Sequence, residues 1–266
     1  MQPLSQCPPE HRARIRGVLT DIDDTLTTHG HLTALAYSAM ERIHRAGAML
    51  IPITGRPAGW CDHIARMWPV DAVVGENGAL WFRYDPRSRQ MERHYAVQGA
   101  ARQAQREHLN AVAEHILHAV PNARIAADQL YRETDLAIDY CEDVKRLSDA
   151  EVEAIVSIMV NHGLTAKVSS IHVNGWIGTH DKLTMTLSLL YECFGISPAV
   201  ARDSFAFVGD SPNDQSMFEY FSCSVGVANV RDFESRITVL PAYVTTADSG
   251  AGFAEFSELL FPASRA

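Results

Sequence analysis

The chain has 266 residues, of which 32 are acidic and 23 are basic, so its formal net charge at pH 7 is −9. Hydrophobic residues make up 47% of the sequence, which is enough for a buried core and argues against a disordered chain. The length allows one large domain or two smaller ones, since single domains cluster at roughly 100–150 residues. The acidic balance disfavours nucleic-acid and membrane partners, because both are polyanionic, but it permits a small anionic substrate.

The cysteines indicate the compartment. There are five, an odd number, and no two form a CxxC pair. This pattern favours reduced thiols and a cytoplasmic location. We find neither a signal-peptide-like apolar stretch nor a run of about 18 apolar residues, so no membrane span is expected. Residues 1–14 are polar and rich in proline, and we expect them to be a mobile N-terminal segment. The oligomeric state does not follow from the sequence.

The first part of the chain alternates between predicted strands and helices. Short apolar runs predict strands at 15–20, 49–53 and 71–75. Between them, apolar residues recur with helical spacing over 32–47, and Pro57 suits the first turn of a helix over 57–67. Strands that alternate with helices through short links predict a parallel sheet.

The pattern changes after residue 83. Residues 84–93 are charged and turn-like, and a long helix is expected to end near Val120. Residues 134–140 alternate as a strand with one buried face, and 165–174 form another strand. Between them, Ser148 and Glu151 form a capping box that opens a helix. We therefore expect an inserted α+β cap domain at 84–178.

The parallel-sheet pattern resumes after the insertion. A helix over 181–194 is followed by predicted strands at 204–208, 224–227 and 243–245, and by a final helix near 250–260. The predicted fold class is α/β, with a Rossmann-like parallel-sheet core built from residues 15–83 and 179–266.

Polar clusters follow three of the predicted strands. In open α/β sheets, ligands bind beyond the carboxyl ends of the strands, so we expect these clusters to converge, with Lys182 at the start of the returning helix. The clusters are Asp21-Ile22-Asp23-Asp24-Thr25, Thr54-Gly55-Arg56 and Gly209-Asp210-Ser211-Pro212-Asn213-Asp214.

Converging carboxylates would need cations. Two like charges 4 Å apart repel by about 4 kcal/mol at an effective dielectric constant near 20. All-oxygen donors that leave room for water favour Mg²⁺. A carboxylate, Mg²⁺, a lysine and a threonine hydroxyl together suit phosphoryl transfer, in which the carboxylate attacks phosphorus. Asp23 lies two residues after Asp21, on the same side of an extended strand, and could transfer the proton.

Each motif also has an ordinary structural interpretation. Asp21 and Asp23 alone could be solvated turn residues or helix caps, and Asp214 could cap the helix that follows it. A lysine such as Lys182 usually lies on the surface. Arg56 either contacts a substrate or pairs with a neighbouring acid. The occurrence of four motifs in order favours the functional interpretation.

In these four motifs the sequence resembles the haloacid-dehalogenase superfamily of aspartate-nucleophile phosphatases. The family pattern hhhhDxDxT matches residues 18–25, the second-motif Thr or Ser matches Thr54, the motif-three lysine matches Lys182, and GDxxND matches residues 209–214. The long insertion between the second and third motifs is similar to the type IIB cap branch, which includes Cof-like, sucrose-phosphate and mannosylphosphoglycerate phosphatases. Asp24 stands where the family more often has glycine.

The resemblance implies a role for each acidic residue. Asp21 would be the nucleophile that forms an aspartyl-phosphate. Asp23 would be the general acid and base, and its backbone carbonyl would also bind Mg²⁺. Asp210 would be a direct Mg²⁺ ligand, and Asp214 either a ligand or a residue that supports one. The predicted metal site is therefore Asp21, Asp23, Asp210 and Asp214.

The resemblance also implies the substrate contacts. Thr54 and Lys182 would hold the phosphoryl oxygens and belong to the catalytic set. Asn213 would line the site, and Gly55 and Arg56 complete the predicted substrate-binding residues.

These inferences predict a Mg²⁺-dependent phosphomonoesterase that acts on a small phosphorylated metabolite, either a sugar phosphate or a phosphoglycerate derivative. One alternative is a phosphosugar mutase, which would need a second phosphate clamp in the cap, with Arg124, Arg132 and Lys167 as scattered candidates. The other alternative is a non-catalytic phospho-accepting module that resembles a response-regulator receiver, although such receivers are shorter and lack the GDxxND motif.

Overall fold

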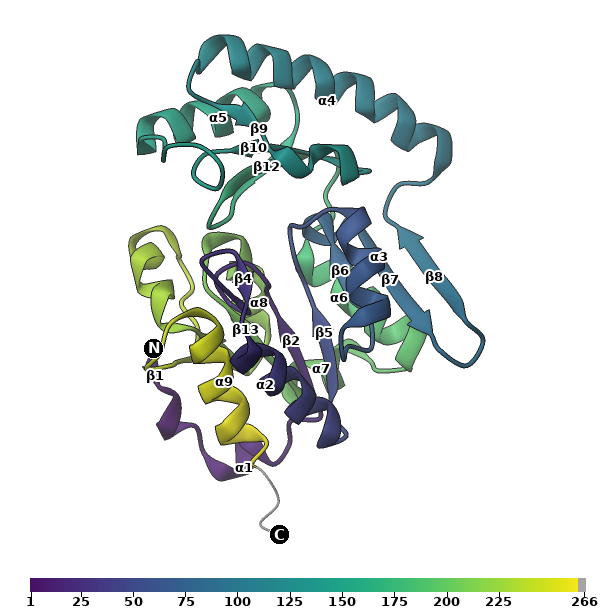
Figure 1. Ribbon diagram of the computed structural model, residues 1–266, viewed down its shortest axis with the longest axis vertical. Coiled ribbons are helices and arrows are strands. Elements are labelled where there is room, and N and C mark those ends of the chain that lie inside the picture. Colours follow the sequence, from purple (N-terminus) through teal and green to yellow (C-terminus); the bar gives the residue numbers. More distant parts are fainter. Residues whose placement is uncertain (263–266) are drawn as a thin grey trace.

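A computed structural model describes residues 1–262 of the chain, and its centre is a six-stranded parallel sheet (Figure 1). The strand order is β1-β15-β14-β13-β2-β5, and every pairing is parallel. This confirms the predicted α/β class. The strands are β1 (Gln2–Pro3), β2 (Gly17–Thr20), β5 (Met49–Pro52), β13 (Phe205–Gly209), β14 (Cys223–Gly226) and β15 (Tyr243–Val244).

Helices cover both faces of this core sheet, which explains why its strands are apolar throughout. Successive residues of a strand enter different clusters: Val18 packs into one and Leu19 into the other. The first cluster lies beneath α2 (Ala34–Arg45), α3 (Ala58–Met67) and α9 (Ser249–Leu260). The second lies beneath α6 (Lys182–Phe194), α7 (Pro198–Ser204) and α8 (Gln215–Tyr220).

A hairpin leads from the core toward the insertion. Strand β6 (Val73–Gly75) joins the core sheet only through a parallel bridge between Ile53 and Val74, and it pairs with β7 (Leu80–Asp85), which pairs with β8 (Gln90–Tyr95). The turn expected over residues 84–93 is present but shorter: it spans residues 86–89, and the flanking residues belong to β7 and β8. Much of β8 is exposed and charged, so it lacks the apolar alternation that identifies a strand. The predicted domain boundary at 83/84 falls within β7.

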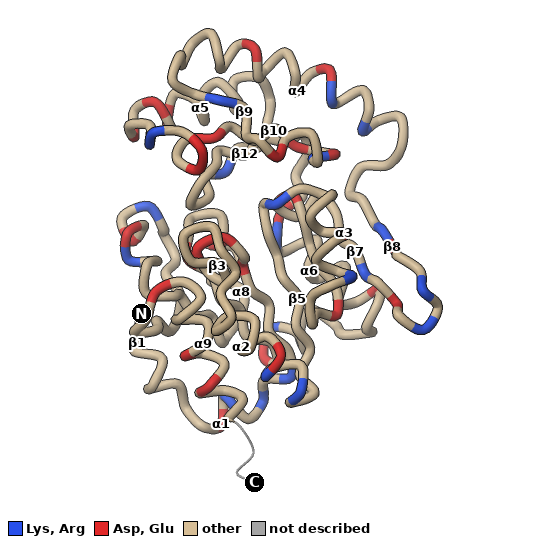
Figure 2. Tube along the Cα trace, viewed as in Figure 1, with Lys and Arg blue, Asp and Glu red and all other residues tan. Residues whose placement is uncertain are grey.

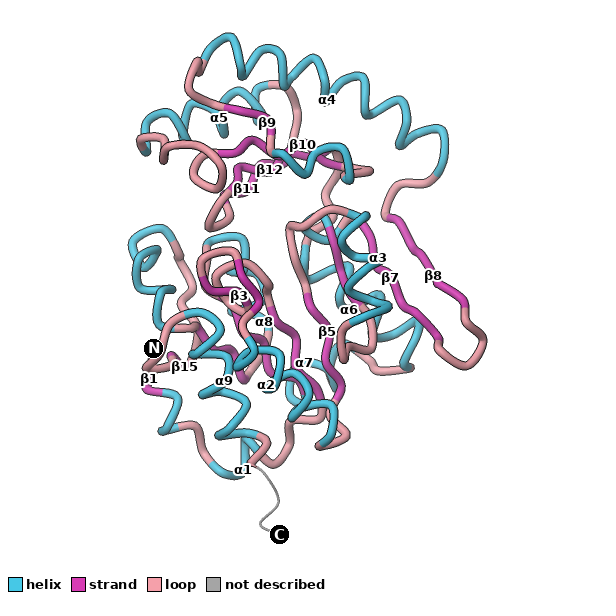
Figure 3. The backbone as a smooth tube through the Cα atoms, in the orientation of Figure 1, coloured by secondary structure: helices cyan, strands magenta, loops and turns pink. Residues whose placement is uncertain are grey.

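The insertion forms a second α+β layer over the carboxyl ends of the core strands. Its antiparallel sheet, the cap sheet, has the order β11-β12-β10-β9, with β9 (Arg124–Ile125), β10 (Asp135–Asp139), β11 (Thr165–Val168) and β12 (His172–Trp176). Helices α4 (Gly99–Ala119) and α5 (Asp149–Asn161) cover its outer face (Figure 3). They share an apolar cluster with the sheet that includes Val112 and Ile155. The predicted capping box of Ser148 and Glu151 opens α5.

The inner face of the cap sheet carries polar residues and points at the core. Strand β10 was expected to bury one face, but all five of its residues are buried. Leu136 and Ile138 pack beneath the cap helices, whereas Asp135 and Asp139 are covered on the other side and hydrogen-bonded. Figure 2 shows charged segments on both sides of the boundary between cap and core. The alternation was interpreted correctly, but partnered carboxylates can be buried as completely as leucines.

The N-terminal segment is packed rather than loose. Gln2 and Pro3 pair with β15, and the side chains of Leu4 and Cys7 are each only 1% exposed. The expectation of a mobile segment thus differs from the structure, because two apolar side chains anchor an otherwise polar stretch. All five cysteines are unpaired, and all lie within the described range.

Short elements complete the described chain, and they are β3 (Thr27–Thr28), β4 (His31–Leu32), α1 (Pro9–Arg12) and the 3₁₀ helices η1 (Leu4–Gln6), η2 (Glu76–Gly78), η3 (Ala127–Tyr131), η4 (Pro212–Asp214) and η5 (Ala228–Arg236). Within residues 1–262, no single helix is long and apolar enough to cross a membrane, although the bent pair α6 and α7 meets that test by length and composition.

One glycine permits η2 to touch the start of α6. Gly78 has φ +99°, and a Cβ there would lie 2.0 Å from the carbonyl oxygen of Asp181. We expect Gly78→Ala to lower the free energy of unfolding by about 3–4 kcal/mol, because it combines backbone strain with a backbone clash. The matched control is Gly163→Ala, where φ is +79° but the space is open. It should cost about 1 kcal/mol. Equal losses in urea denaturation would contradict the close approach.

Candidate active site

The structure brings the predicted strand-end residues to one edge of the core sheet. Asp21 directly follows β2, Asp210 directly follows β13, and Thr54 lies two residues after β5. These three strands are neighbours in the sheet, so their carboxyl ends meet. Lys182 is the first residue of α6 and points into the same place.

Lys182 joins two of the carboxylates. Its Nζ lies 2.7 Å from Asp21 Oδ1 and 2.7 Å from Asp214 Oδ1. The lysine side chain is 2% exposed. Burial alone would favour the neutral amine, but the charges of Asp21 and Asp214 outweigh it and raise the lysine pKa. Lys182 is therefore a buried cation, and the ordinary interpretation of a surface lysine does not apply.

Asp214 turns back onto its own loop. Its Oδ2 accepts hydrogen bonds from the backbone N–H groups of Asp210 and Ser211, at 3.1 and 3.3 Å. Gly209 makes this possible, since a Cβ there would lie 2.5 Å from Asp214 Oδ2. Asp214 thus holds the loop after β13 with one oxygen and contacts Lys182 with the other.

If all three buried carboxylates are ionised, they carry more negative charge than one lysine can balance. Oxygen atoms of Asp21, Asp210 and Asp214 all lie within 4.8 Å of one another. Burial, assisted by the charges of Asp214 and Asp23, raises the pKa of Asp21 to about 8 despite Lys182. Burial and the charges of Asp21 and Asp214 also raise the pKa of Asp210 well above its usual range. An all-carboxylate group with this surplus of charge suits a hard divalent cation.

The side chain of Asp23 lies outside this acidic group. Its two carboxylate oxygens lie 2.9 and 3.0 Å from Arg56 Nε, and Oδ1 is also 2.8 Å from Arg56 Nη2. Arg56 therefore pairs with neighbouring acids, which was one of its two predicted roles. The predicted contribution of the Asp23 backbone carbonyl to a metal site stays a prediction.

Three other predicted residues lie close by. Thr54 is fully buried, and its hydroxyl accepts a hydrogen bond from the Arg56 backbone N–H at 3.0 Å. Asn213 donates to Asn77 Oδ1 at 3.3 Å. Gly55 and Asn213 line a small cavity together with Asp21, Asp23 and Arg56. The predicted site residues are thus assembled, and Asn77, which was not among them, lies beside Asn213.

The cap closes over this cavity. Residues from the β11–β12 turn and from β12 form its roof, and they are Ser169, Ile171, His172 and Asn174. The enclosed space is only about 10 Å³. Asp21 and His172 therefore border one small, shielded volume in this conformation.

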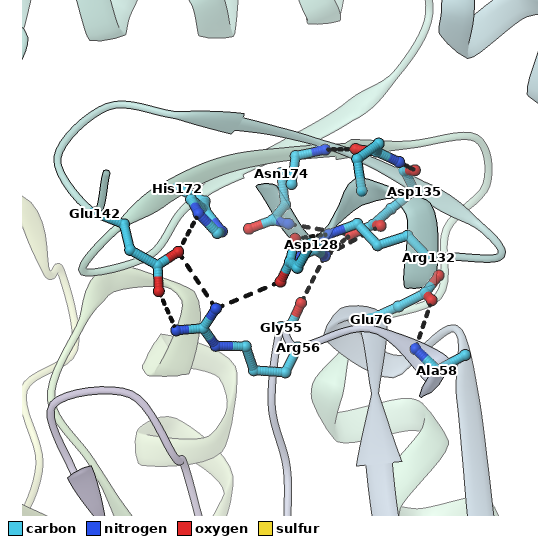
Figure 4. A network of polar contacts seen from close by, with 12 residues as sticks. Gly55, Arg56, Ala58, Glu76, Asp128, Arg132, Asp135, Glu142, His172 and Asn174 are labelled. Atoms are coloured by element: carbon cyan, nitrogen blue, oxygen red, sulfur yellow. Dashed lines mark hydrogen bonds and ion pairs between the residues drawn. The ribbon is translucent and has the colours of Figure 1, made fainter. Parts of the chain in front are cut away.

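A network of ion pairs joins cap and core beside the cavity (Figure 4). Arg56 of the core reaches Glu142 and Asp128 of the cap, at 2.6 and 3.4 Å. Arg132 of the cap pairs with Asp128 and donates to the Gly55 carbonyl at 2.7 Å. Sequence reasoning missed Glu142 and Asp128 because each is one acid among many, with no motif around it.

Comparisons with known proteins agree with this arrangement. No protein-family model matches the sequence. The chain is 24% identical over 250 residues to the phosphoglycolate phosphatase of Methanosarcina mazei, and 22% identical over 250 residues to that of Methanospirillum hungatei. Each alignment covers 93% of this chain and 97% of the relative.

Solved structures with the same architecture include three hydrolases. A haloacid dehalogenase-like hydrolase from Bacteroides thetaiotaomicron superposes with a TM-score of 0.62 at 16% identity, covering 93% of this chain and 100% of its own. A putative HAD/COF-like hydrolase from Plasmodium vivax has a TM-score of 0.66 at 18% identity, with 93% and 96% covered. The chain has the haloacid-dehalogenase-like fold. The sucrose-phosphatase of Synechocystis, solved with sucrose and phosphate, has a TM-score of 0.61 at 15% identity, with 92% and 98% covered. The resemblance predicted from the four motifs is confirmed at the level of this HAD-like fold.

The buried lysine of this HAD-like core generates a stability prediction. Replacing Lys182 by Met removes the charged hydrogen-bond donor that Asp21 and Asp214 share, and it leaves both carboxyl groups buried without that partner. We expect a loss of about 3–5 kcal/mol in the free energy of unfolding. Lys167→Met is the matched control, because Lys167 is exposed on β11 and should change stability by less than about 0.5 kcal/mol. Chemical denaturation at neutral pH without divalent metal measures both, and similar losses would contradict the assigned role of Lys182.

Proposed function

We propose that the protein is a phosphomonoesterase that forms an aspartyl-phosphate on Asp21. The observation that carries the proposal is the buried contact of Asp21 with Lys182, beside Asp210 and Asp214 and beneath the cap. The relatives, which are named phosphoglycolate phosphatases, support the same reaction class. The cytoplasmic location stays a prediction.

The residues divide the reaction into two displacements. An oxygen of Asp21 attacks phosphorus while the ester oxygen leaves and takes a proton from Asp23. In the second step Asp23 removes a proton from water, which attacks phosphorus and returns the Asp21 carboxylate. Lys182 and Thr54 hold the phosphoryl oxygens, where negative charge spreads in the transition state. The roof formed by the cap excludes other water molecules.

A divalent cation fits the acidic group. Asp21, Asp210 and Asp214 offer oxygen donors of the kind that Mg²⁺ prefers, and their charge surplus is what a dication neutralises. We propose Asp210 and Asp21 as ligands and Asp214 as the residue that orients the loop, since its oxygens already contact Lys182 and two backbone N–H groups. Bound Mg²⁺ would supply charge neutralisation for the phosphoryl group.

A small, acidic substrate is the first candidate. The enclosed volume beneath the cap is small, and the sequence relatives are named for phosphoglycolate. This narrows the predicted substrate range from sugar phosphates toward phosphorylated acids of two or three carbons. The division of the chain into a catalytic core and a cap that selects the substrate remains part of this proposal.

The mutase alternative is less well supported. Arg132 is committed to Asp128 and Asp135, and Arg124 donates to the carbonyls of Pro121 and Ala123. Lys167 is exposed on β11. These three residues therefore do not make a second phosphate clamp. The aspartyl-phosphate of a non-catalytic module would persist, whereas that of a phosphatase turns over.

Phosphate release tests the nucleophile. We expect Asp21→Asn to lower phosphate release from 2-phosphoglycolate with Mg²⁺ by about 10³-fold or more, because an amide oxygen is a poor nucleophile. Asp203→Asn is the control, since Asp203 is exposed on α7 and contacts only Ser222 by hydrogen bond. It should match the wild type. Normal turnover by the folded Asp21→Asn variant would refute the mechanism.

The metal can be tested by stability as well as by activity. At a Mg²⁺ concentration of about 100 times Kd, binding adds about 2.7 kcal/mol to stability. For a chain of this size that corresponds to a rise of about 5–10 °C in Tm. We expect Asp210→Asn to remove most of this rise, because it removes an anionic donor. Asp203→Asn should retain the rise. If the wild-type Tm does not respond to Mg²⁺, the metal proposal fails.

A further inference from the structure

The guanidinium of Arg56 holds two carboxylates at once. Its Nε and Nη2 face Asp23, and its Nη2 and Nη1 lie 2.6 and 3.3 Å from the two oxygens of Glu142. The Glu142 contact is the end-on, two-oxygen geometry by which the two terminal nitrogens of arginine recognise a carboxylate (Figure 4). Arg56 belongs to the core, whereas Glu142 belongs to the loop after β10 of the cap.

A histidine completes the surroundings of the Glu142 carboxylate. Nε2 of His172 lies 2.8 Å from Glu142 Oε2, and the His172 side chain is 3% exposed. This contact has the distance of an ion pair but not the angles of a hydrogen bond, so His172 Nε2 is a buried polar atom without a hydrogen-bond partner among the described residues. Burial alone would oppose ionisation of Glu142, but its contacts with His172 and Arg56 outweigh burial and lower its pKa to about 2. Arg56 and His172 thus surround one carboxylate with two buried nitrogen-bearing side chains.

Glu142 is the exchangeable partner of Arg56. Asp128 also lies 3.4 Å from Arg56, but Arg132 holds it at 2.8 and 2.9 Å. Asp23 contacts Arg56 through both of its oxygens and lies beside the nucleophile. The Glu142 side chain is 26% exposed, and it borders an open cavity of about 430 Å³ into which it can swing.

These two side chains and the nucleophile share one volume. Asp21, Arg56 and His172 all line the same cavity of about 10 Å³. A molecule whose phosphorus lies at Asp21 can therefore place a second acidic group on Arg56 and His172 only if few atoms separate the two. Phosphorylated hydroxy acids of two or three carbons carry their phosphoryl and carboxylate groups only a few bonds apart.

We propose that Arg56 and His172 form a carboxylate-binding subsite, which Glu142 fills in the free, closed protein and which the carboxylate of a small phosphorylated hydroxy acid fills in the substrate complex. The Glu142 carboxylate then occupies the position of the substrate carboxylate in the free protein, and it moves into the neighbouring cavity when the substrate binds. This inference rests on the proposed function, because it places the phosphoryl group of the same molecule at Asp21.

Two substrates that differ in one group test the subsite. 2-Phosphoglycolate carries the carboxylate, and 2-hydroxyethyl phosphate carries a neutral hydroxymethyl group in its place. The measured quantity is the ratio of their kcat/KM values. We expect Arg56→Gln to lower the ratio by about 10–100-fold, the worth of a hydrogen bond to a charged group. Arg56→Lys keeps the charge but loses the two-point geometry, so its ratio should lie between those of the wild type and Arg56→Gln.

The Glu142→Gln variant distinguishes two roles of Glu142: a carboxylate that occupies the substrate subsite, and an ion-pair partner that only holds the cap closed. Removing the competing negative charge should raise the ratio severalfold, mainly through a lower KM for 2-phosphoglycolate. If the ion pair of Glu142 only holds the cap closed, its loss should instead change kcat/KM for both substrates by the same factor. Glu153→Gln is the matched control, because Glu153 is exposed on α5, and it should leave the ratio at the wild-type value. Melting temperatures of all the variants show whether each is folded.

The outcomes distinguish this inference from the proposed function. An unchanged ratio in Arg56→Gln, or equal effects of Glu142→Gln on both substrates, overturns the subsite while leaving the phosphatase standing. If the wild type hydrolyses neither compound, the proposed function fails, and calorimetry with 2-phosphoglycolate decides the subsite. Binding to the wild type that is lost in Arg56→Gln then supports it, and absence of binding to the wild type overturns it.

Discussion

The contact between Lys182 and two buried carboxylates is the interaction on which the rest of the molecule depends. A lysine at 2% exposure is costly to bury, and so are Asp21 and Asp214. Each becomes acceptable only because the others are present. The contact links the end of β2, the start of α6 and the loop after β13, three segments that are far apart in the sequence. The helix that carries the lysine must therefore be held at the sheet edge, and Gly78 gives η2 the room to hold it there.

Much of this arrangement could be predicted from the sequence, for a physical reason. Parallel strands buried on both faces are continuous apolar runs, so 15–20 and 204–208 were recognisable, and their carboxyl ends must meet at one edge. Asp21, Asp210 and Lys182 were found in this way. Asp23 was also identified, but its pairing with Arg56 was left open, because Arg56 could equally well have bound a substrate.

The features that the sequence did not reveal are those made by long-range polar contacts or by small apolar anchors. Glu142 and Asp128 occupy no motif, and their importance comes only from Arg56, which lies on another part of the chain. The N-terminal segment was expected to be mobile because its composition is polar, yet the burial of Leu4 and Cys7 fixes it. Strand β8 was missed because half of its residues are exposed, and although Met91 and Tyr95 pack against the core, Arg93 between them breaks the apolar alternation.

The way cap and core are joined explains how a shielded site can also admit a substrate. Among the described residues, each of the three apolar clusters lies wholly within the core or wholly within the cap. Polar contacts cross the boundary, and they are Arg56 with Glu142, Arg132 with the Gly55 carbonyl, and Glu76 with the backbone N–H groups of Glu133 and Thr134. Beside them, the Tyr131 side chain of the cap packs near Gly59 of the core. Opening the cap therefore exposes mainly polar groups that water can satisfy, and little apolar surface. Closing it buries Arg56 with several carboxylates, so the closed state is electrostatically satisfied only while the guanidinium has an acidic partner. Whichever carboxylate fills that position, from the cap or from a substrate, closes the roof over Asp21.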